Sequence, residues 1–531
     1  MFTTKPHLQI AKLSGYCFSA LAIIFVWAGC SAPDSNSSGS TDEQRTARAM
    51  DAAKANPLSL RTFLVAMPKG GDLHVHLSGA VYAESWIRAG AEDKLCVNTA
   101  TLSFTPGVGG SCKKGDVAAA QVFSDQHLYD ELVDAFSMRG FVPTTGVTGH
   151  DHFFDAFPRF GSVGARHTGE WLDEVASRAA RQNEQYLELM VTPPFDHTAS
   201  IANEIGWNAD RTLSEFRELL FAKRLQDDVA VARAYLDQAE SLRRQREHCG
   251  ETNESPGCSV QIRYIYQVLR AFPPAQVFAQ TLLGFEAGAV DPRIVGINYV
   301  QPEDNEVAMS DYALHMKMLE YLHGVYPHMH ISLHAGELAP GLVPPDGLCC
   351  HIRLAVEQAH AERIGHGVDV MQEDRPYDLL KEMSAKHVMV EINLTSNDVI
   401  LGITGDEHPL RMYMKFGVPV ALSTDDEGVS RIDLSHEFVR AVETHGLTYE
   451  DLKRMVRTSI ENSFLPGASL WQERDQFDHL APACSGDTFS KGEHSPACAT
   501  LLQSSERARQ QWELERRFKI FEADHSGNDR P

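Results

Sequence analysis

Basic residues are scarce in this sequence: 48 lysines and arginines stand against 72 aspartates and glutamates, a formal net charge of −24. This charge argues against nucleic acid or an anionic membrane surface as the main partner. It also disfavours a phosphorylated substrate, which would need a cluster of basic side chains. Since 43% of the 531 residues are hydrophobic, the chain can bury a large core, as one large domain with insertions or as two or three domains.

Cysteine pairs in the Cys-x-x-Cys spacing are absent, so a structural zinc ribbon is not expected. The cysteines that follow Cys30 suggest another use. Three pairs would close short polar loops, which predicts disulfides and an oxidising compartment: Cys96 with Cys112, Cys249 with Cys258, and Cys484 with Cys498. The adjacent Cys349 and Cys350 receive no assignment from the sequence.

Long apolar runs are limited to one, near the N-terminus. Lysines precede the run Ala20–Trp27, and two small residues and Cys30 follow it. This pattern predicts a lipoprotein-type export signal over residues 1–29, with Cys30 as the lipidation site. Cleavage at an ordinary signal site, or an uncleaved anchor, stays open. Residues 30–41 are polar and rich in Ser and Gly, typical of a flexible tether.

The expected location follows from this signal. We expect an exported protein, in a bacterial periplasm or on an outer membrane as a lipoprotein, or otherwise secreted. No other segment is long and apolar enough to span a membrane, so contact with a membrane is expected only through the N-terminal lipid or signal anchor.

Strand-like and helical segments alternate along the rest of the chain, which is typical of parallel strands joined by helices. Eight such units predict an α/β fold, a closed (β/α)8 TIM barrel with inserted loops. The first strand surrounds Leu73, and the others lie at 186–191, 260–265, 294–299, 331–334, 363–366, 388–392 and 418–423.

Segments outside the barrel are expected at both ends. An N-terminal helix should run to about Asn56, where Pro57 ends it and residues 63–67 lead into the first strand. We expect residues 42–466 to form the barrel with this extension. Residues 467–531 should form an insertion and a terminal helix that packs on the barrel.

Histidines at alternate positions mark the first strand. His74 and His76 point to one face because side chains two apart on a strand share a side. Imidazole nitrogen suits zinc, although two polar residues on the wet face of an ordinary strand would look the same. A second His-x-His, His150 and His152, lies among helical aromatic residues, and we expect it in solvent or at a pocket rim.

The ends of later strands strengthen the metal hypothesis. In TIM barrels, catalytic residues come from the carboxyl ends of the strands. Three histidines and one aspartate predict a single zinc ion per chain, and three further groups remain for acid–base work. The metal set is His74, His76, His334 and Asp425, and the remaining groups are Glu337, His366 and Asp426.

The order of these motifs resembles the adenosine deaminases of the metal-dependent amidohydrolase superfamily, over about residues 67–465. The long N-terminal extension and the cysteine-bracketed insertions resemble the secreted, growth-factor-related branch of that family. The motifs that carry the resemblance are Met67-Pro68-Lys69, Asp72-Leu73-His74-Val75-His76-Leu77, Leu333-His334-Ala335-Gly336-Glu337, Arg363-Ile364-Gly365-His366-Gly367 and Ser423-Thr424-Asp425-Asp426.

The resemblance implies a reaction: zinc-dependent hydrolytic deamination of adenosine or 2′-deoxyadenosine to inosine or 2′-deoxyinosine and ammonia. His366 and Asp425 would orient and deprotonate the attacking water. Glu337, held protonated, would give its proton to purine N1. Asp426 would bind purine N7.

Two positions depart from the family pattern. Ser78 stands where the family usually has an aspartate that binds the ribose 5′-hydroxyl. Gln301 stands where a glycine usually offers its backbone N–H to purine N3. Two alternatives therefore stay open. One is a deaminase of a 5′- or N6-modified adenine nucleoside, and the other is a nucleoside-binding or signalling protein with incidental catalysis.

Overall fold

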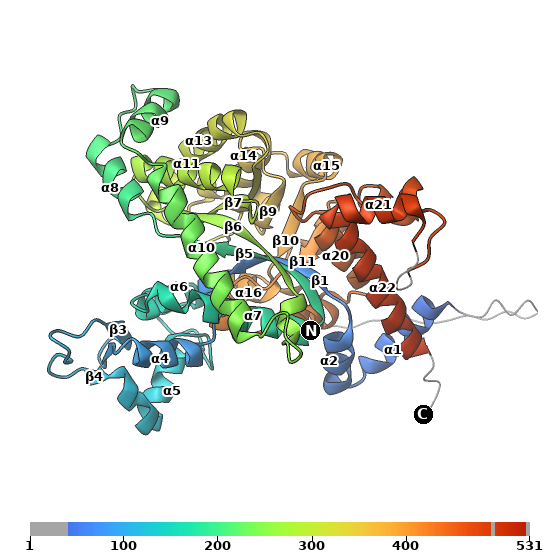
Figure 1. Cartoon of the computed structure of the whole chain (residues 1–531), viewed down its shortest axis with the longest axis horizontal. Coiled ribbons are helices and arrows are strands. Elements are labelled where there is room, and N and C mark those ends of the chain that lie inside the picture. The colour runs from blue at the N-terminus through green and yellow to red at the C-terminus, as the bar shows by residue number, and fades with distance from the viewer. Residues whose placement is uncertain (1–40, 490–493, 527–531) are drawn as a thin grey trace, which may run out of the picture. The chain divides into compact units, whose positions relative to one another are not determined.

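The computed structural model describes residues 41–489 and 494–526. Eight parallel strands form one sheet, with helices around it (Figure 1). Hydrogen bonds between the first strand and the segment after the last join the two ends of the sheet: His76 N–H donates to the Asp425 carbonyl at 3.1 Å, and Asp425 N–H to the His74 carbonyl at 2.9 Å. The predicted (β/α)8 TIM barrel is confirmed. Its strands are β1 (Gly70–His76), β5 (Glu184–Val191), β6 (Gln261–Leu269), β7 (Ile294–Val300), β8 (His330–Ala335), β9 (Arg363–His366), β10 (Met389–Ile392) and β11 (Val420–Leu422).

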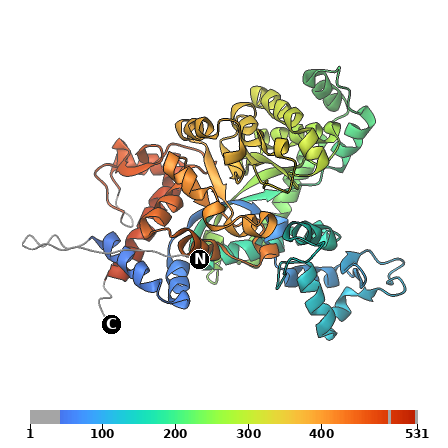
Figure 2. The same ribbon diagram turned by 180° about the vertical axis from the view of Figure 1, so that it is seen from behind.

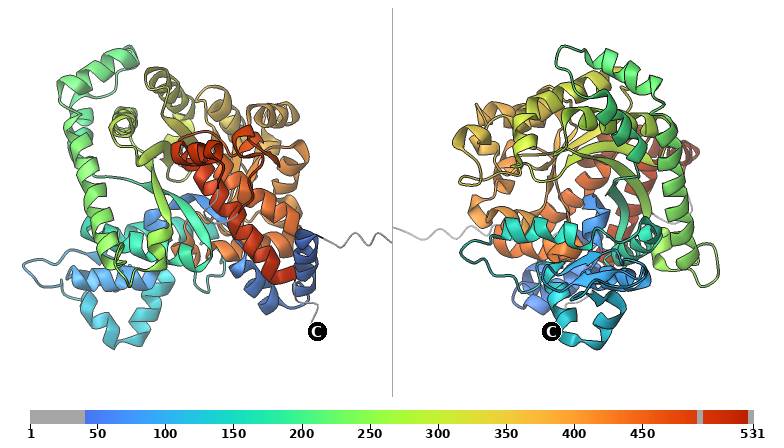
Figure 3. Two further views of the ribbon diagram at one scale, coloured as in Figure 1. Left: turned by 45° about the vertical axis from the view of Figure 1, so that its right-hand side comes forward. Right: turned by 90° about the vertical axis from the view of Figure 1, so that its left-hand side faces the viewer.

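Helices surround these strands, as Figures 2 and 3 show from other sides. Every residue of β1, β5 and β7 is buried, as expected for parallel strands that are covered on both faces. The covering helices are α7 (Thr168–Arg181), α11 (Pro274–Val290), α13 (Tyr312–Val325), α14 (His351–Glu357), α15 (Pro376–Lys386), α17 (Leu410–Phe416), α19 (Leu434–His445) and α20 (Tyr449–Glu461).

Two long insertions follow the first two strands of the barrel. The first joins β1 to α7, and its last helix, α6, reaches the carboxyl ends of the strands. It contains α3 (Leu77–Ala80), α4 (Ala83–Glu92), β2 (Cys96–Asn98), β3 (Ser103–Thr105), β4 (Val117–Ala118), α5 (Gln126–Ala135) and α6 (Gly149–Phe160). The second joins β5 to β6 and contains α8 (Asp196–Ile205), α9 (Leu213–Ala222) and α10 (Asp227–Arg246).

The first helix ends before Pro57, as expected, but the sequence analysis missed a second helix that begins there. Pro57 begins a helix, α2 (Pro57–Ala66), rather than only ending the preceding α1 (Asp42–Ala53). Proline is tolerated at the first helical position because the amide N–H that it lacks has no partner there. The Asn56 side chain caps this helix by accepting the N–H groups of Leu58 and Ser59 at 2.9 and 3.2 Å.

The C-terminal segment packs on the barrel. The hairpin β12 (Trp471–Glu473) and β13 (Gln476–Leu480) precedes α21 (Pro496–Ser504) and α22 (Glu506–Ser526). Arg457 of α20 pairs with Glu515 of α22 through two contacts of 2.7 Å. The single predicted terminal helix is thus two helices, which meet at Ser505.

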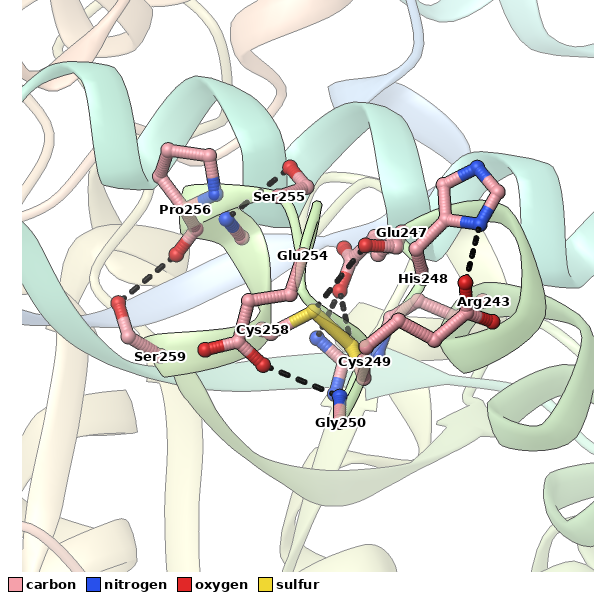
Figure 4. Close-up of a disulfide and its surroundings, with 12 residues drawn as sticks. Arg243, Glu247, His248, Cys249, Gly250, Glu254, Ser255, Pro256, Cys258 and Ser259 are labelled. Atoms are coloured by element: carbon pink, nitrogen blue, oxygen red, sulfur yellow. Dashed lines mark hydrogen bonds and ion pairs between the residues drawn. A yellow bond between two sulfur atoms is a disulfide. The ribbon is translucent and has the colours of Figure 1, made fainter.

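The three predicted disulfides are present, between Cys96 and Cys112, Cys249 and Cys258, and Cys484 and Cys498. Figure 4 shows the second, after the end of α10, where the Gly250 N–H donates to Glu254 at 3.0 Å. Each bond closes a loop and so reduces the number of conformations that the unfolded chain can adopt. The unassigned Cys349 and Cys350 are bonded to each other.

The predicted export signal and most of the tether lie outside the described residues. Among the described helices, none has the length and apolar character needed to cross a bilayer.

Candidate active site

Four donor atoms converge at the carboxyl ends of the strands. His74 and His76 come from β1, His334 from β8, and Asp425 from the segment after β11. His334 Nε2 lies 3.1 Å from the Nε2 atoms of both His74 and His76. Asp425 Oδ1 lies 3.5 Å from His74 Nε2 and 3.3 Å from His76 Nε2. All four side chains are buried, and the sequence predicted this set.

Acceptors behind each imidazole fix which nitrogen faces the centre. His74 Nδ1 contacts Glu391 Oε2 at 2.6 Å, and His76 Nδ1 contacts Gln267 Oε1 at 3.1 Å. His334 Nδ1 contacts Asn298 Oδ1 at 2.8 Å. Because each Nδ1 donates outward, each Nε2 presents a lone pair inward, the arrangement that metal-binding histidines adopt. Three nitrogen donors and one carboxylate therefore fit a zinc ion.

The electrostatics of this centre also favour a cation. Burial disfavours a charged His74, but the carboxylates of Asp425 and Glu391 outweigh it and raise the pKa of His74 to about 10. Burial and the neighbouring imidazoles hold the pKa of His334 well below its usual range. The carboxylates thus favour a positive charge at this centre, either a proton on His74 or a metal ion in its place, while His334 keeps a neutral donor nitrogen.

Glu337 lies beside this centre, and the carboxylate of Glu303 fixes the position of its backbone. The N–H groups of Gly336 and Glu337 donate to Glu303 at 3.0 and 2.8 Å. Burial, with the charges of Asp425 and Glu303, raises the pKa of the Glu337 carboxyl well above its usual range. This shift favours the protonated form of Glu337, the form that can act as an acid.

The tautomer of His366 follows from a chain of hydrogen bonds that begins at a backbone amide. The Leu410 N–H donates to His408 Nδ1 at 3.1 Å, so the His408 proton is on Nε2, which contacts Asn397 Oδ1 at 3.0 Å. The Asn397 amide nitrogen then lies 2.9 Å from His366 Nδ1 and donates to it. Since burial lowers the pKa of both histidines to about 3, His366 is neutral and carries its proton on Nε2.

Asp426 follows Asp425, a member of the predicted metal set, and packs against Gly79. A Cβ on Gly79 would lie 1.5 Å from Asp426 Oδ1, so glycine is required at this position. Asp426 Oδ1 and His366 Nε2 are buried without a hydrogen-bond partner among the described residues. Buried polar atoms are rarely left unpaired in a folded protein, so both atoms are free for a bound ligand.

A cavity with a volume of about 410 Å³ opens over these groups. Phe153, Phe154 and Phe157 of α6 form an apolar wall, and His76, His334, Glu337, Asp425 and Asp426 form a polar one. Apolar walls with a few convergent polar groups are typical of small-molecule sites, and the volume lies within their range of about 300–1,000 Å³. We call this space the site cavity.

The positions that depart from the family pattern both line the site cavity. Ser78 is exposed on α3. Gln301 has φ +85°, a conformation that favours glycine. Its side-chain oxygen accepts the Ala271 N–H at 2.9 Å.

The second His-x-His lies near the site cavity but does not join the metal set. His150 of α6 pairs with Asp304 at 3.0 Å. His152 is near the carbonyls of Asp134 and Ser137, at 3.1 Å from each. Both residues belong to α6, whose phenylalanines line the cavity, but neither histidine is among the lining residues.

Comparison with known families agrees with this geometry. The family described as "Adenosine deaminase" matches residues 171–478, more than half of the chain. The chain belongs to the adenosine deaminase family. The adenosine deaminase of Clostridium perfringens is 36% identical to this family member over 135 residues, 25% of this chain and 37% of the relative. This chain therefore matches little more than a third of the length of its first curated relatives.

Other relatives differ in the substrate that their names give. The adenine deaminase of Rhizobium leguminosarum bv. trifolii is 28% identical over 303 residues, 57% of this chain and 75% of the relative. The solved structure of an Arabidopsis N6-mAMP deaminase, 21% identical, matches 76% of this chain and 95% of its own with a TM-score of 0.50. It shows that the two chains share a fold. The suggested likeness to the growth-factor-related branch stays a prediction.

Sequence reasoning missed the residues that hold the site residues in place. They are carboxylates and amides that contact a member of the metal set or a catalytic group but lie far from it in the chain, and one imidazole that contacts one of these amides. Buried polar residues within strand patterns, such as Glu391 in β10, were the available signal. The missed residues are Gln267, Asn298, Glu303, Glu391, Asn397 and His408.

Proposed function

We propose that this protein is a zinc-dependent deaminase that converts adenosine or 2′-deoxyadenosine to the inosine product and ammonia. The observation that carries the proposal is the buried Glu337 beside a centre of three imidazoles and one carboxylate, inside one cavity. Glu337 supplies the acid that purine N1 needs, and the four donors suit zinc. Membership in the adenosine deaminase family supports deamination of a purine.

Zinc held by His74, His76, His334 and Asp425 would supply Lewis acidity, which makes water acidic enough to attack near neutral pH. The protein groups then divide the remaining work. Glu337 protonates N1, and the purine ring accepts electrons as water adds to C6. Of the two protons of the water, one leaves with the amino group as ammonia, and the other restores Glu337.

His366 serves as a hydrogen-bond donor in this proposal. The sequence resemblance suggested that His366 helps to deprotonate water. With its proton on Nε2, His366 instead orients the attacking oxygen by donating a hydrogen bond to it. The base is then Asp425, whose Oδ2 lies 3.9 Å from His366 Nε2. Asp425 Oδ2 also accepts the Ser396 hydroxyl at 2.7 Å. Asp426 is then free to bind N7.

Modified adenine nucleosides are the second candidate substrates, because Ser78 places a neutral side chain where the family usually has a carboxylate. No lysine or arginine lines the described site cavity, so AMP should be a poor substrate. Ammonia release from adenosine, 2′-deoxyadenosine, adenine, 5′-deoxyadenosine, N6-methyladenosine and AMP separates these candidates. Absence of turnover on the whole panel would favour the nucleoside-binding alternative.

Export as a lipoprotein remains part of the proposal. It is supported by the apolar run before Cys30 and by an oxidised fold with four disulfides. Labelled palmitate should be incorporated by the wild-type chain and not by Cys30→Ser. Labelling of both chains, or of neither, would refute lipidation at this residue.

A further inference from the structure

A second chamber lies next to the site cavity. It has a volume of about 330 Å³, and three of its lining residues, Ser78, Thr192 and Gln267, also line the site cavity. The two spaces therefore meet along these three side chains. Gln267 donates to the Thr192 hydroxyl at 3.2 Å, while its amide oxygen contacts Nδ1 of the metal ligand His76 at 3.1 Å.

The walls of the second chamber are mainly apolar. Trp86 and Trp171 form one side, with ring centroids 4.6 Å apart, and Phe195 and Tyr235 contribute further aromatic surface. No lysine, arginine or histidine is among the described lining residues, and Asp196 is the charged one. The nearby Arg166 is paired with Asp93 at 2.6 Å. Such a chamber suits a neutral apolar group and opposes a phosphate.

The position of the chamber indicates which part of a substrate would enter it. In the proposed reaction, purine C6 faces the metal centre and N1 faces Glu337, so the ribose lies on the opposite side of the ring. Ser78 follows the ligand His76 by two residues and is exposed where the two spaces meet. In the part of the chain that the structure describes, the Ser78 side chain makes no hydrogen bond that would close this passage.

We propose that the second chamber binds an apolar 5′-substituent, so that adenosines with a 5′-thioether are substrates of this enzyme. The proposal rests on the proposed deaminase function and adds the substrate class. The 5′ carbon is the point on the ribose from which a substituent extends without altering the ring. A thioether chain at this carbon would move from water into contact with the aromatic walls. Each added methylene should therefore raise kcat/KM about fourfold, as long as the chamber has room for it.

The test is ammonia release from adenosine and from the 5′-methylthio, 5′-ethylthio and 5′-propylthio adenosines. The variant Ala165→Trp fills the chamber from its exposed rim, since Ala165 lines the chamber and not the site cavity. Ala55→Trp, at an exposed alanine outside both spaces, is the matched control. We expect kcat/KM to rise with the length of the 5′-substituent in the wild type and the control, and to stay flat or fall in Ala165→Trp. Adenosine turnover should agree within about twofold in all three proteins.

The outcomes separate the two proposals. A flat or falling series in a wild type that deaminates adenosine overturns the chamber and leaves the deaminase function intact. A kcat/KM that rises with substituent length in Ala165→Trp as it does in the wild type also overturns the chamber proposal. AMP turnover comparable to that of the thioethers contradicts a neutral chamber. No deamination of any adenosine overturns the proposed function and this inference together.

Discussion

The Asn397 amide donates to Nδ1 of His366 at 2.9 Å and so decides which nitrogen of that histidine carries the proton. The direction of this bond is set at the Leu410 backbone N–H, which can only donate, and is passed on through His408. Two neutral imidazoles and one amide thus leave the His366 proton on Nε2, which lies 3.9 Å from Asp425 Oδ2.

Asn397→Asp should reverse the tautomer of His366. A carboxylate accepts from both histidines, so the His366 proton would move to Nδ1 and Nε2 would lose its donor. We expect kcat to fall by about 10- to 100-fold with zinc content unchanged. Nitrogen-15 NMR of labelled histidine reports the tautomer directly. A variant that loses activity but keeps the Nε2–H tautomer would contradict this assignment.

Two glycine substitutions should separate metal binding from substrate binding. A Cβ on Gly79 would meet Asp426 at 1.5 Å, whereas a Cβ on Gly365 would meet the His74 ring at 2.5 Å. Gly79→Ala should therefore weaken substrate binding and keep zinc. Gly365→Ala should lower zinc affinity.

Zinc content by elemental analysis and KM measured at saturating zinc distinguish the two variants. Equal zinc loss in both would show that Gly79 acts on the metal centre. Zinc retained in full by Gly365→Ala would mean that His74 moves without cost or is not a ligand.

Glu337→Gln should keep the metal and lose the reaction. Glutamine preserves the shape of the side chain but has no proton to give to N1, so kcat should fall by at least about 10²-fold. Elemental analysis of the same preparation should give one zinc per chain, as in the wild type. Near-normal turnover would show that Glu337 is not the acid.

Stability should depend on pH through Glu437, a buried residue of α19. Burial raises the pKa of Glu437 to about 7, and the two hydrogen bonds from Thr395 offset part of that effect. The folded state therefore holds this proton more tightly than the unfolded state does. The stabilisation is fully present below the unfolded pKa of about 4.3 and is lost as pH rises to about 7, about 4 kcal/mol in all.

The matched variant is Glu437→Gln, which cannot ionise. Its melting temperature should rise relative to that of the wild type as pH increases from about 4.5 to 7.5. The difference between the two proteins is the measurement, because other groups titrate equally in both. A difference that stays constant over this range would contradict the raised pKa of Glu437.

The sequence by itself determined the elements and the chemistry of the site. Alternating apolar segments defined the eight strands, because strands and helices differ in the period of their buried side chains. His74 and His76 marked one face of β1 by their spacing, and the motifs at later strand ends supplied His334, Glu337, His366 and Asp425. The local disulfides followed from short cysteine separations.

The tertiary structure decided what depends on contacts between distant segments. Glu303 holds the backbone of Glu337 from 34 residues away, and Glu391 contacts His74 from 317 residues away, distances along the chain that no local pattern encodes. The position of the proton on His366 and the chamber beside Ser78 also depend on contacts between residues that are far apart in the chain. Hydrogen-bond direction and cavity shape exist only once the barrel brings its strand ends together, because both are properties of side chains that face each other in space.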